Sequence, residues 1–167
     1  VANVGVEVPL EAYSEESDPH DHEHGDGHDH DHDHDHGDDE HWIEDLEREA
    51  KGKGDVADLA TRGRSFELAA APAAGKITVI DFWAEWCEPC HAIDRMLRAL
   101  AAKHPNLAVR RVEIVDLESP AAVDHLKGVT GLPVVWIVDE NGKRLETLVA
   151  TDARAVHERL EEHLKKQ

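Results

Sequence analysis

Cysteine is scarce in this chain of 167 residues, which contains only Cys87 and Cys90. Folds stabilised by disulfides need several cysteine pairs, and one pair two residues apart closes too small a loop to hold a fold together. A structural zinc site usually needs a second pair of ligands, and the chain has no second cysteine pair. The two cysteines are therefore better explained by redox chemistry.

The chain also lacks the sequence patterns of several other functions. No apolar run approaches the ~18 residues of a membrane span, so we expect no integral membrane segment. No glycine-rich phosphate loop or nicotinamide-binding fingerprint occurs, so electrons should come from another protein and the redox reaction should need no bound cofactor. Basic residues are nearly missing from the first third of the chain, and the rest is balanced in charge, which argues against nucleic-acid binding.

The acidic residues are concentrated at the N-terminal end. Residues 1–49 hold 19 of the 37 Asp and Glu residues and only one of the 18 Lys and Arg residues. A segment with so few periodic apolar residues cannot bury enough surface to offset the entropy of ordering. We therefore expect a disordered, acidic, His-rich tail over 1–40, a helical linker over 41–54 and a folded domain over 55–167, with a monomeric state overall.

The chain begins with Val rather than Met. This leads us to expect that an upstream segment, for example a signal segment, has been removed. Together with a tail suited to metal scavenging, it favours an extracytoplasmic setting, either a bacterial periplasm or a secreted state.

Hydrophobic periodicity and turn residues predict an α/β fold. The expected order is strand, helix, strand, helix, strand, strand, helix, which gives a central mixed sheet with helices on both faces. The segment 65–74 fits either a short strand at 66–68 or an alanine-rich helix. The expected helices are 41–48, 55–62, 92–103, 120–127 and one that starts at Thr151 or Asp152; the expected strands are 77–83, 108–115, 134–138 and 144–149.

The two cysteines fall where a buried strand gives way to a helix. A helix N-terminus has unpaired N–H groups and a positive dipole end, so Cys87 is placed to be a thiolate. Pro89 suits the first turn of a helix because it has no N–H to leave unpaired. Cys90 lies one turn further on, where it can resolve a mixed disulfide formed by Cys87.

The segment from Asp81 to Cys90, DFWAEWCEPC, resembles the active-site segment of the thioredoxin family. Gly131, Leu132 and Pro133, followed by a strand and an Asn-Gly hairpin, resemble the family's second landmark, a cis-proline loop that faces the active site. The resemblance extends over about 55–166. It implies a three-layer thioredoxin-like fold and a thiol–disulfide oxidoreductase that reduces protein disulfides and is itself reduced by an upstream protein.

The resemblance also implies residue roles. Asp81 matches a buried aspartate that shuttles a proton for the resolving cysteine, and burial raises the pKa of such a carboxylic acid. Trp86 matches the aromatic residue beside the nucleophile, and Leu132 and Pro133 match the loop that binds substrate backbone. The family often has a lysine as the partner of the aspartate, whereas here we expect Glu113 at that place.

Glu88 is the main departure from the family motif, which has glycine at this position. A carboxylate next to Cys87 disfavours the thiolate and partly opposes the helix dipole. Because a stabilised thiolate makes a protein more oxidising, Glu88 points toward a reductant. His91 acts in the opposite sense when it is protonated.

The tail carries the second signal, a run of histidines that alternate with carboxylates. Imidazole suits zinc, copper and nickel, so this flexible polyligand predicts metal binding. The alternative is an acidic, pH-sensitive tail that confers solubility. Two other functions stay open for the whole chain: a metal-handling protein or metallochaperone, and a non-catalytic protein-binding module. The histidines proposed as ligands are His20, His22, His24, His28, His30, His32, His34 and His36.

Overall fold

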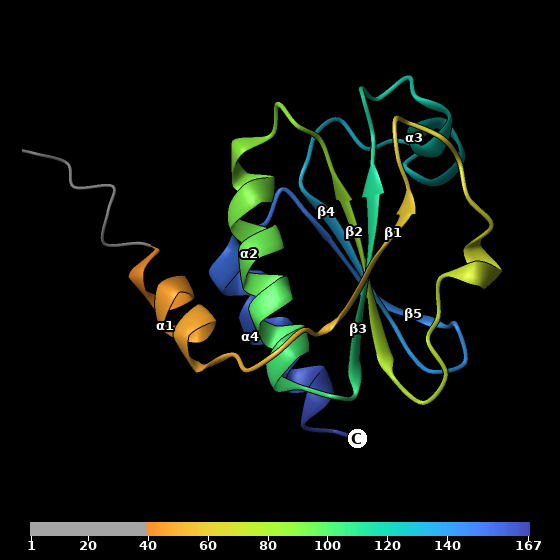
Figure 1. Cartoon of the computed structure of the whole chain (residues 1–167). Helices are drawn as coiled ribbons and strands as arrows, with labels where there is room; N and C mark the ends of the chain where they lie inside the picture. Colours follow the sequence, from red (N-terminus) through yellow and green to blue (C-terminus); the bar gives the residue numbers. More distant parts are fainter. Residues whose placement is uncertain (1–39) are drawn as a thin grey trace, which may run out of the picture. The chain divides into compact units, whose positions relative to one another are not determined.

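Five strands form one mixed sheet in the computed structural model, which describes residues 40–167 (Figure 1). Their order across the sheet is β1-β3-β2-β4-β5. Strands β1, β3 and β2 are parallel, while β4 is antiparallel to both β2 and β5. This is the expected α/β fold class. The strands are β1 (Asp55–Ala60), β2 (Ile77–Trp83), β3 (Leu107–Glu113), β4 (Val134–Val138) and β5 (Arg144–Val149).

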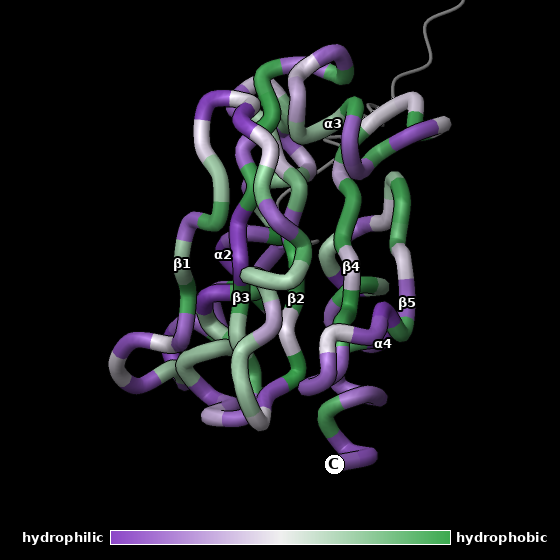
Figure 2. Tube along the Cα trace, turned by 90° about the vertical axis from the view of Figure 1, so that its right-hand side faces the viewer, coloured by the Kyte–Doolittle hydropathy of each residue, from purple (hydrophilic) through white to green (hydrophobic). Residues whose placement is uncertain are grey.

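The centre of the sheet is built from the most apolar strands. All five residues of β4 and all but the last of β2 are buried, and Figure 2 shows hydrophobic residues running through both strands. β-branched side chains favour this pleated, two-sided environment. The expected hairpin between β4 and β5 is confirmed: the Asp139 side chain accepts hydrogen bonds from the N–H groups of Asn141 at 2.9 Å and Lys143 at 2.8 Å, and Gly142 takes the positive φ that the turn requires.

Helices cover both faces of the sheet. On one face, α1 (His41–Glu49), α2 (Glu88–Lys103) and α4 (Ala153–Leu164) bury one hydrophobic cluster against the strands. On the other face, α3 (Pro120–His125) and the short 3-10 helix η1 (Leu68–Ala70) border a second cluster, which includes both cysteines. Helix α2 contributes the fully buried Leu97 and Leu100 to the first cluster. Replacing such a leucine with alanine typically lowers the free energy of unfolding by about 2–5 kcal/mol, so packing against the sheet fixes the position of α2.

One expected helix is wrong. Residues 55–62 were predicted to be helical, with Asp55 as the N-cap, but Asp55–Ala60 forms the edge strand β1. Asp55 instead forms ion pairs with Lys76 and Arg110, each at 2.8 Å. The pairing of β1 with β3 outweighs the helical spacing of a few apolar residues. Gly54 permits this route, because a β carbon there would overlap the backbone of Ala101.

The other elements differ from the expectations mainly at their ends. Helix α2 begins four residues before the expected Ala92, and the expected strand 108–115 is found at Leu107–Glu113. The ambiguous segment 65–74 contains only η1. Within residues 40–167, none of the helices is both long and apolar enough to cross a membrane. The tail predicted for residues 1–40 lies outside the described residues except for Glu40.

Candidate active site

The two cysteines lie at the junction between β2 and α2. Cys87 is the N-cap residue of α2, 4% exposed, and Cys90 in the first turn is fully buried. They form a disulfide with a Cα–Cα distance of 5.3 Å, and the Cys90 N–H donates to the Cys87 carbonyl at 3.1 Å. No side chain caps this end of α2. Its first N–H groups and the positive end of its dipole can therefore stabilise a sulfur anion at Cys87.

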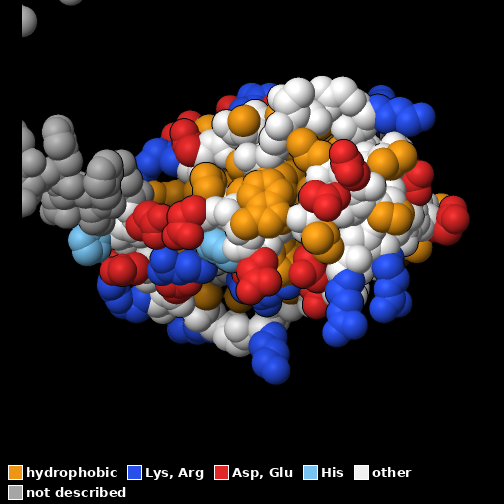
Figure 3. Space-filling model, turned by 90° about the horizontal axis from the view of Figure 1, so that it is seen from above, with side chains coloured by type: hydrophobic (Ala, Val, Ile, Leu, Met, Phe, Trp, Pro, Cys, Tyr) orange, Lys and Arg blue, Asp and Glu red, His pale blue; other side chains and the backbone are white. Residues whose placement is uncertain are grey.

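Trp86 directly precedes Cys87 in the chain and is 61% exposed. Its indole Nε1–H donates to the Val115 carbonyl at 2.7 Å, which fixes the ring against the loop that follows β3. Figure 3 looks down on this end of the molecule and shows hydrophobic side chains at the centre of the face with acidic ones around them. Glu85 and Glu88 are both exposed, and neither has an ion-pair partner within the described part of the chain. Pro89, also exposed, follows Glu88 in the first turn.

The loop before β4 packs against the hydrophobic cluster that contains Cys87 and Cys90. The Leu132–Pro133 peptide bond is cis, and Pro133 is buried. The Pro133 carbonyl accepts a hydrogen bond from the Ala150 N–H at 2.8 Å, which ties the loop to the end of β5. Leu132 is half-buried and packs against the hydrophobic cluster that contains both cysteines. The fold thus brings the two sequence landmarks to one cluster.

Asp81 is the only fully buried carboxyl group among the described residues, and neither of its oxygens has a hydrogen-bond partner there. Its pKa is raised from the ordinary 3.8 to about 7, mainly because of burial and next because of the negative charge of Asp94. The charges of Arg111 and Arg98 oppose this effect. Asp81 can therefore gain or lose a proton near neutral pH, which is the property that a proton shuttle requires.

The residue opposite Asp81 is Arg111, not the expected Glu113. Pairing of β2 with β3 starts at Ile77 and Leu107, and this offset places Asp81 next to Arg111. Glu113 pairs with Trp83 instead, and its carboxylate accepts the Arg62 N–H at 2.9 Å. Arg111 thus occupies the position beside Asp81 in the sheet at which Glu113 was expected.

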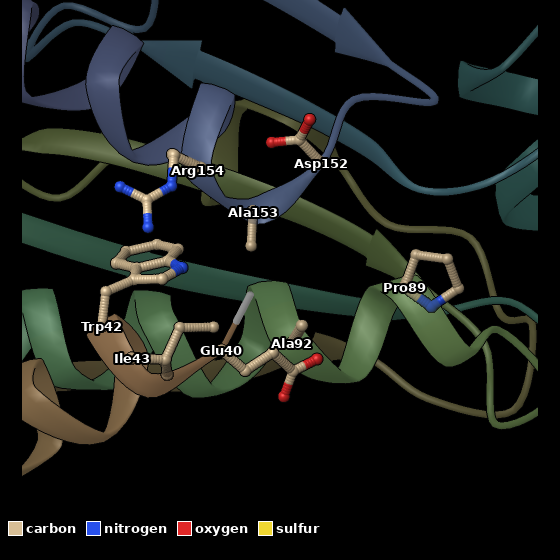
Figure 4. A pocket seen from close by; sticks show the side chains of 8 residues that line it. All are labelled: Glu40, Trp42, Ile43, Pro89, Ala92, Asp152, Ala153 and Arg154. Atoms are coloured by element: carbon tan, nitrogen blue, oxygen red, sulfur yellow. The ribbon is translucent and has the colours of Figure 1, made fainter. Parts of the chain in front are cut away.

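A cavity of about 370 Å³ adjoins the start of α2. It lies between α1, α2 and the beginning of α4, and Pro89 lines one end of it (Figure 4). On the opposite side, the Arg154 guanidinium lies 4.9 Å from the centroid of the Trp42 ring. Sequence reasoning missed this cavity because its wall comes from three separate elements.

Metal ligands are not found in the part of the chain that the structure describes: residues 40–167 contain no group of three or more His, Cys, Asp or Glu side chains able to hold a metal ion. The eight tail histidines predicted as ligands lie outside the described residues. His41, at the start of α1, contacts the Glu44 carboxylate at 3.3 Å.

Sequence comparison places this site in a known family, because the sequence model described as Thioredoxin matches residues 59–166. The chain belongs to the thioredoxin family. Its thioredoxin domain is that of a thiol–disulfide oxidoreductase, with a redox-active disulfide as the working group. The match includes both cysteines and Pro133 but begins after α1.

Individual thioredoxins agree with this assignment. A thioredoxin of Chlamydia trachomatis is 36% identical over 76 residues, which are 46% of this chain and 71% of that protein. A TPR repeat-containing thioredoxin of rice is 31% identical over 97 residues, or 58% of this chain; the match covers only 29% of the rice protein. The solved structure of thioredoxin f from spinach chloroplast covers 68% of this chain and 94% of its own, with a TM-score of 0.50 and 22% identity, which supports the fold.

Proposed function

We propose that the thioredoxin domain reduces disulfide bonds in other proteins, with Cys87 as the attacking thiolate and Cys90 as the resolving thiol. The observation that carries the proposal is the asymmetry of the pair. Cys87 occupies the uncapped N-terminus of α2 and keeps a little exposed surface, whereas Cys90 is fully buried behind it. Only the outer sulfur can meet a substrate, and it is also the sulfur that the helix dipole favours as an anion.

The reaction needs two exchanges. The Cys87 thiolate attacks one sulfur of the substrate disulfide, forms a mixed disulfide and releases the other substrate sulfur as a thiolate, which takes a proton. Cys90 then gives its proton to the Asp81 carboxylate and attacks the Cys87 sulfur. This forms the Cys87–Cys90 disulfide and releases the second substrate sulfur as a thiolate, which takes a proton. The protein loses two electrons and the substrate gains them, so an upstream protein must reduce the pair again.

The surroundings of Cys87 support the direction of reduction. Glu88 is the first residue of α2 and lies exposed beside the nucleophile. Its negative charge disfavours the thiolate, and a less stable thiolate makes the dithiol a better reductant. We expect a midpoint potential closer to the roughly −270 mV of thioredoxin than to the roughly −120 mV of a strong oxidant. Replacing Glu88 with Gln should make the potential less negative.

Two variants separate the roles of the cysteines. Cys87→Ser should abolish insulin disulfide reduction and should form no mixed disulfide. Cys90→Ser should also stop turnover but should trap a substrate on Cys87, which non-reducing electrophoresis and mass spectrometry detect. Retained insulin reduction by Cys87→Ser would eliminate the proposal. A partner that binds wild type and Cys87→Ser equally, without a mixed disulfide, would favour a binding module instead.

A second proposal concerns the tail, whose histidines alternate with Asp and Glu. These side chains supply imidazole and carboxylate ligands for zinc, copper or nickel. Elemental analysis of the full chain and of a variant lacking residues 20–41, each dialysed after loading with zinc, tests this directly. Equal zinc content in both proteins would remove the tail as a metal ligand.

A further inference from the structure

Asp94 lies on α2 four residues after Cys90, so the two side chains share one side of the helix. Its carboxylate contacts two arginines: Oδ1 is 2.7 Å from the Arg111 Nε, and Oδ2 accepts a hydrogen bond from the Arg98 Nε at 2.8 Å. The contact with Arg111 is close, yet neither atom has a hydrogen-bond partner of good geometry. Charge rather than hydrogen bonding holds this ion pair.

The Arg111 guanidinium is held from three directions, and none of these contacts is with Asp81. In addition to Asp94, its Nη1 donates to the Asp58 carboxylate at 2.9 Å, and its central carbon lies 4.4 Å from the centroid of the Trp83 ring. Arg111 is the neighbour of Asp81 in the sheet, but it gives Asp81 no hydrogen bond. Arg111, the cation that pairs with Asp81 in the sheet register, therefore makes its side-chain contacts with Asp94, Asp58 and Trp83.

The charged groups that act on Asp81 come from two neighbouring elements. Helix α2 supplies Asp94 and Arg98, and β3 supplies Arg111. The partner of Asp81 on β4 is Val135, which carries no charge. Asp94 is therefore the one anion in this set, and it contacts both of the cations.

We propose that Asp94 is a positioning residue of the redox site: it engages Arg111 and Arg98, so that neither arginine is hydrogen-bonded to Asp81, and it sets the pH range in which Asp81 accepts the proton of Cys90. This inference rests on the proposed function and adds a residue to it. The negative charge of Asp94 raises the pKa of Asp81, whereas the charges of Arg111 and Arg98 lower it. Both arginines contact Asp94, and neither gives Asp81 a hydrogen bond.

The test follows the Asp81 carboxyl by carbon-detected NMR in the reduced, full-length protein. Asp94→Asn keeps the size of the side chain but removes the charge, so the titration midpoint of Asp81 should fall by roughly one pH unit. Arg111→Gln should move the midpoint in the opposite direction. Asp94→Glu, which restores the charge, should return it toward the wild-type value. Opposite shifts from two partners of one ion pair would not arise from loosened packing.

A matched control uses the other anion that contacts Arg111. Asp58→Asn removes a carboxylate on β1 that is 53% exposed, so it should shift the Asp81 midpoint much less than Asp94→Asn. Thermal unfolding of each oxidised variant shows whether the fold is kept.

The kinetic measurement links the titration to the reaction. The rate at which Cys90 resolves a mixed disulfide on Cys87, measured by stopped flow as a function of pH, should follow the Asp81 midpoint in each variant. An unchanged or raised midpoint in Asp94→Asn would overturn the proposal, and so would a rate profile that ignores a shifted midpoint. Failure of the proposed function would appear separately, as disulfide reduction that survives Cys87→Ser.

Discussion

Helices α2 and α4 both follow a strand of the same sheet, but they begin in different ways. At α4, the Asp152 side chain accepts the Ala155 N–H at 2.8 Å, which is the usual cap of a helix N-terminus. At α2, the cap position is Cys87, and no side chain accepts a hydrogen bond from the first turn. The N-terminus of α4 is thus capped by a side chain, whereas the N-terminus of α2, at the reactive sulfur, has no side-chain cap.

Strand β2 also contains one buried polar group with a hydrogen-bond partner and one without. Thr78 and Asp81 are both fully buried polar residues of this strand. The Thr78 hydroxyl accepts the Ala73 N–H at 2.9 Å, whereas the Asp81 oxygens have no partner among the described residues. Buried polar groups are normally hydrogen-bonded, because an unpaired one costs about 1–3 kcal/mol. On β2, the unpaired buried polar residue is thus Asp81, which is nearer to Cys87 in the chain, and the paired one is Thr78.

The largest expected effect comes from Asp81. Its pKa is raised from 3.8 to about 7, so the folded state binds this proton more tightly than the unfolded state does. The associated stability is fully present below about pH 3.8 and is lost as the pH rises through about 7. The loss amounts to at most about 4 kcal/mol, from 1.36 kcal/mol per pH unit over this interval. Urea unfolding of the oxidised protein at several pH values measures it.

Asp81→Asn supplies the comparison, because an amide does not titrate in this range. Between pH 5 and pH 8, its free energy of unfolding should fall much less than that of the wild type. Parallel pH profiles for the two proteins would mean that Asp81 is already ionised at pH 5, and the contrast along β2 would then lose its basis.

Thr78→Val tests the satisfied end of β2. Valine keeps the shape of threonine but cannot accept the Ala73 N–H, which is left partly buried and unpaired. The free energy of unfolding should fall by about 1–3 kcal/mol, with little change in disulfide reduction. Thr151→Val is the matched control, since the Thr151 hydroxyl makes an exposed hydrogen bond to the Val149 carbonyl. Equal costs for the two variants would show that burial at position 78 adds nothing.

Much of this architecture could be predicted from local patterns. The apolar β-branched run of β2, the helical spacing of α2 and the Asn-Gly turn before β5 each report on their own neighbourhood, and each element was found. Strand β1 was mistaken for a helix because its conformation depends on pairing with β3, a partner about 50 residues away. Edge strands with few buried residues carry little periodic signal of their own.

The candidate site likewise contains residues that could be predicted from local sequence and residues that depend on distant parts of the chain. Cys87 and Cys90 could be recognised from their spacing and the flanking residues. The arginine beside Asp81 depends on the register between β2 and β3, which sequence alone misplaced by two residues. In the sequence, Asp94 is one of several charged residues of α2, and nothing in the pattern except its spacing from Cys90 distinguishes it from the others. Its two arginine contacts require the packed structure.

Asp152→Ala tests the capped N-terminus of α4. Loss of the side-chain acceptor leaves the Ala155 N–H without its partner, so the protein should lose about 1 kcal/mol of stability. Asp152→Asn keeps an acceptor oxygen, so its free energy of unfolding should fall by only a few tenths of a kcal/mol. Insulin reduction should be unchanged in both variants. A stability equal to that of the wild type in Asp152→Ala would mean that water replaces the cap at no cost.

The smallest effect concerns the uncapped N-terminus of α2, where a cap can be added. The comparison uses two proteins without the disulfide, Cys87→Ser/Cys90→Ser and Cys87→Ala/Cys90→Ser, so that the loss of the S–S bond cancels. Cys87 has the extended backbone of an N-cap residue, with φ −93° and ψ 94°, and a serine hydroxyl there can accept an N–H from the first turn of α2. The serine protein should be more stable than the alanine protein by about 0.5 kcal/mol, at the low end of the range for caps. Thermal unfolding of the two proteins side by side measures the difference. If serine adds no stability, the first turn of α2 has no unsatisfied N–H groups to offer, and the same groups could not stabilise a sulfur anion at Cys87.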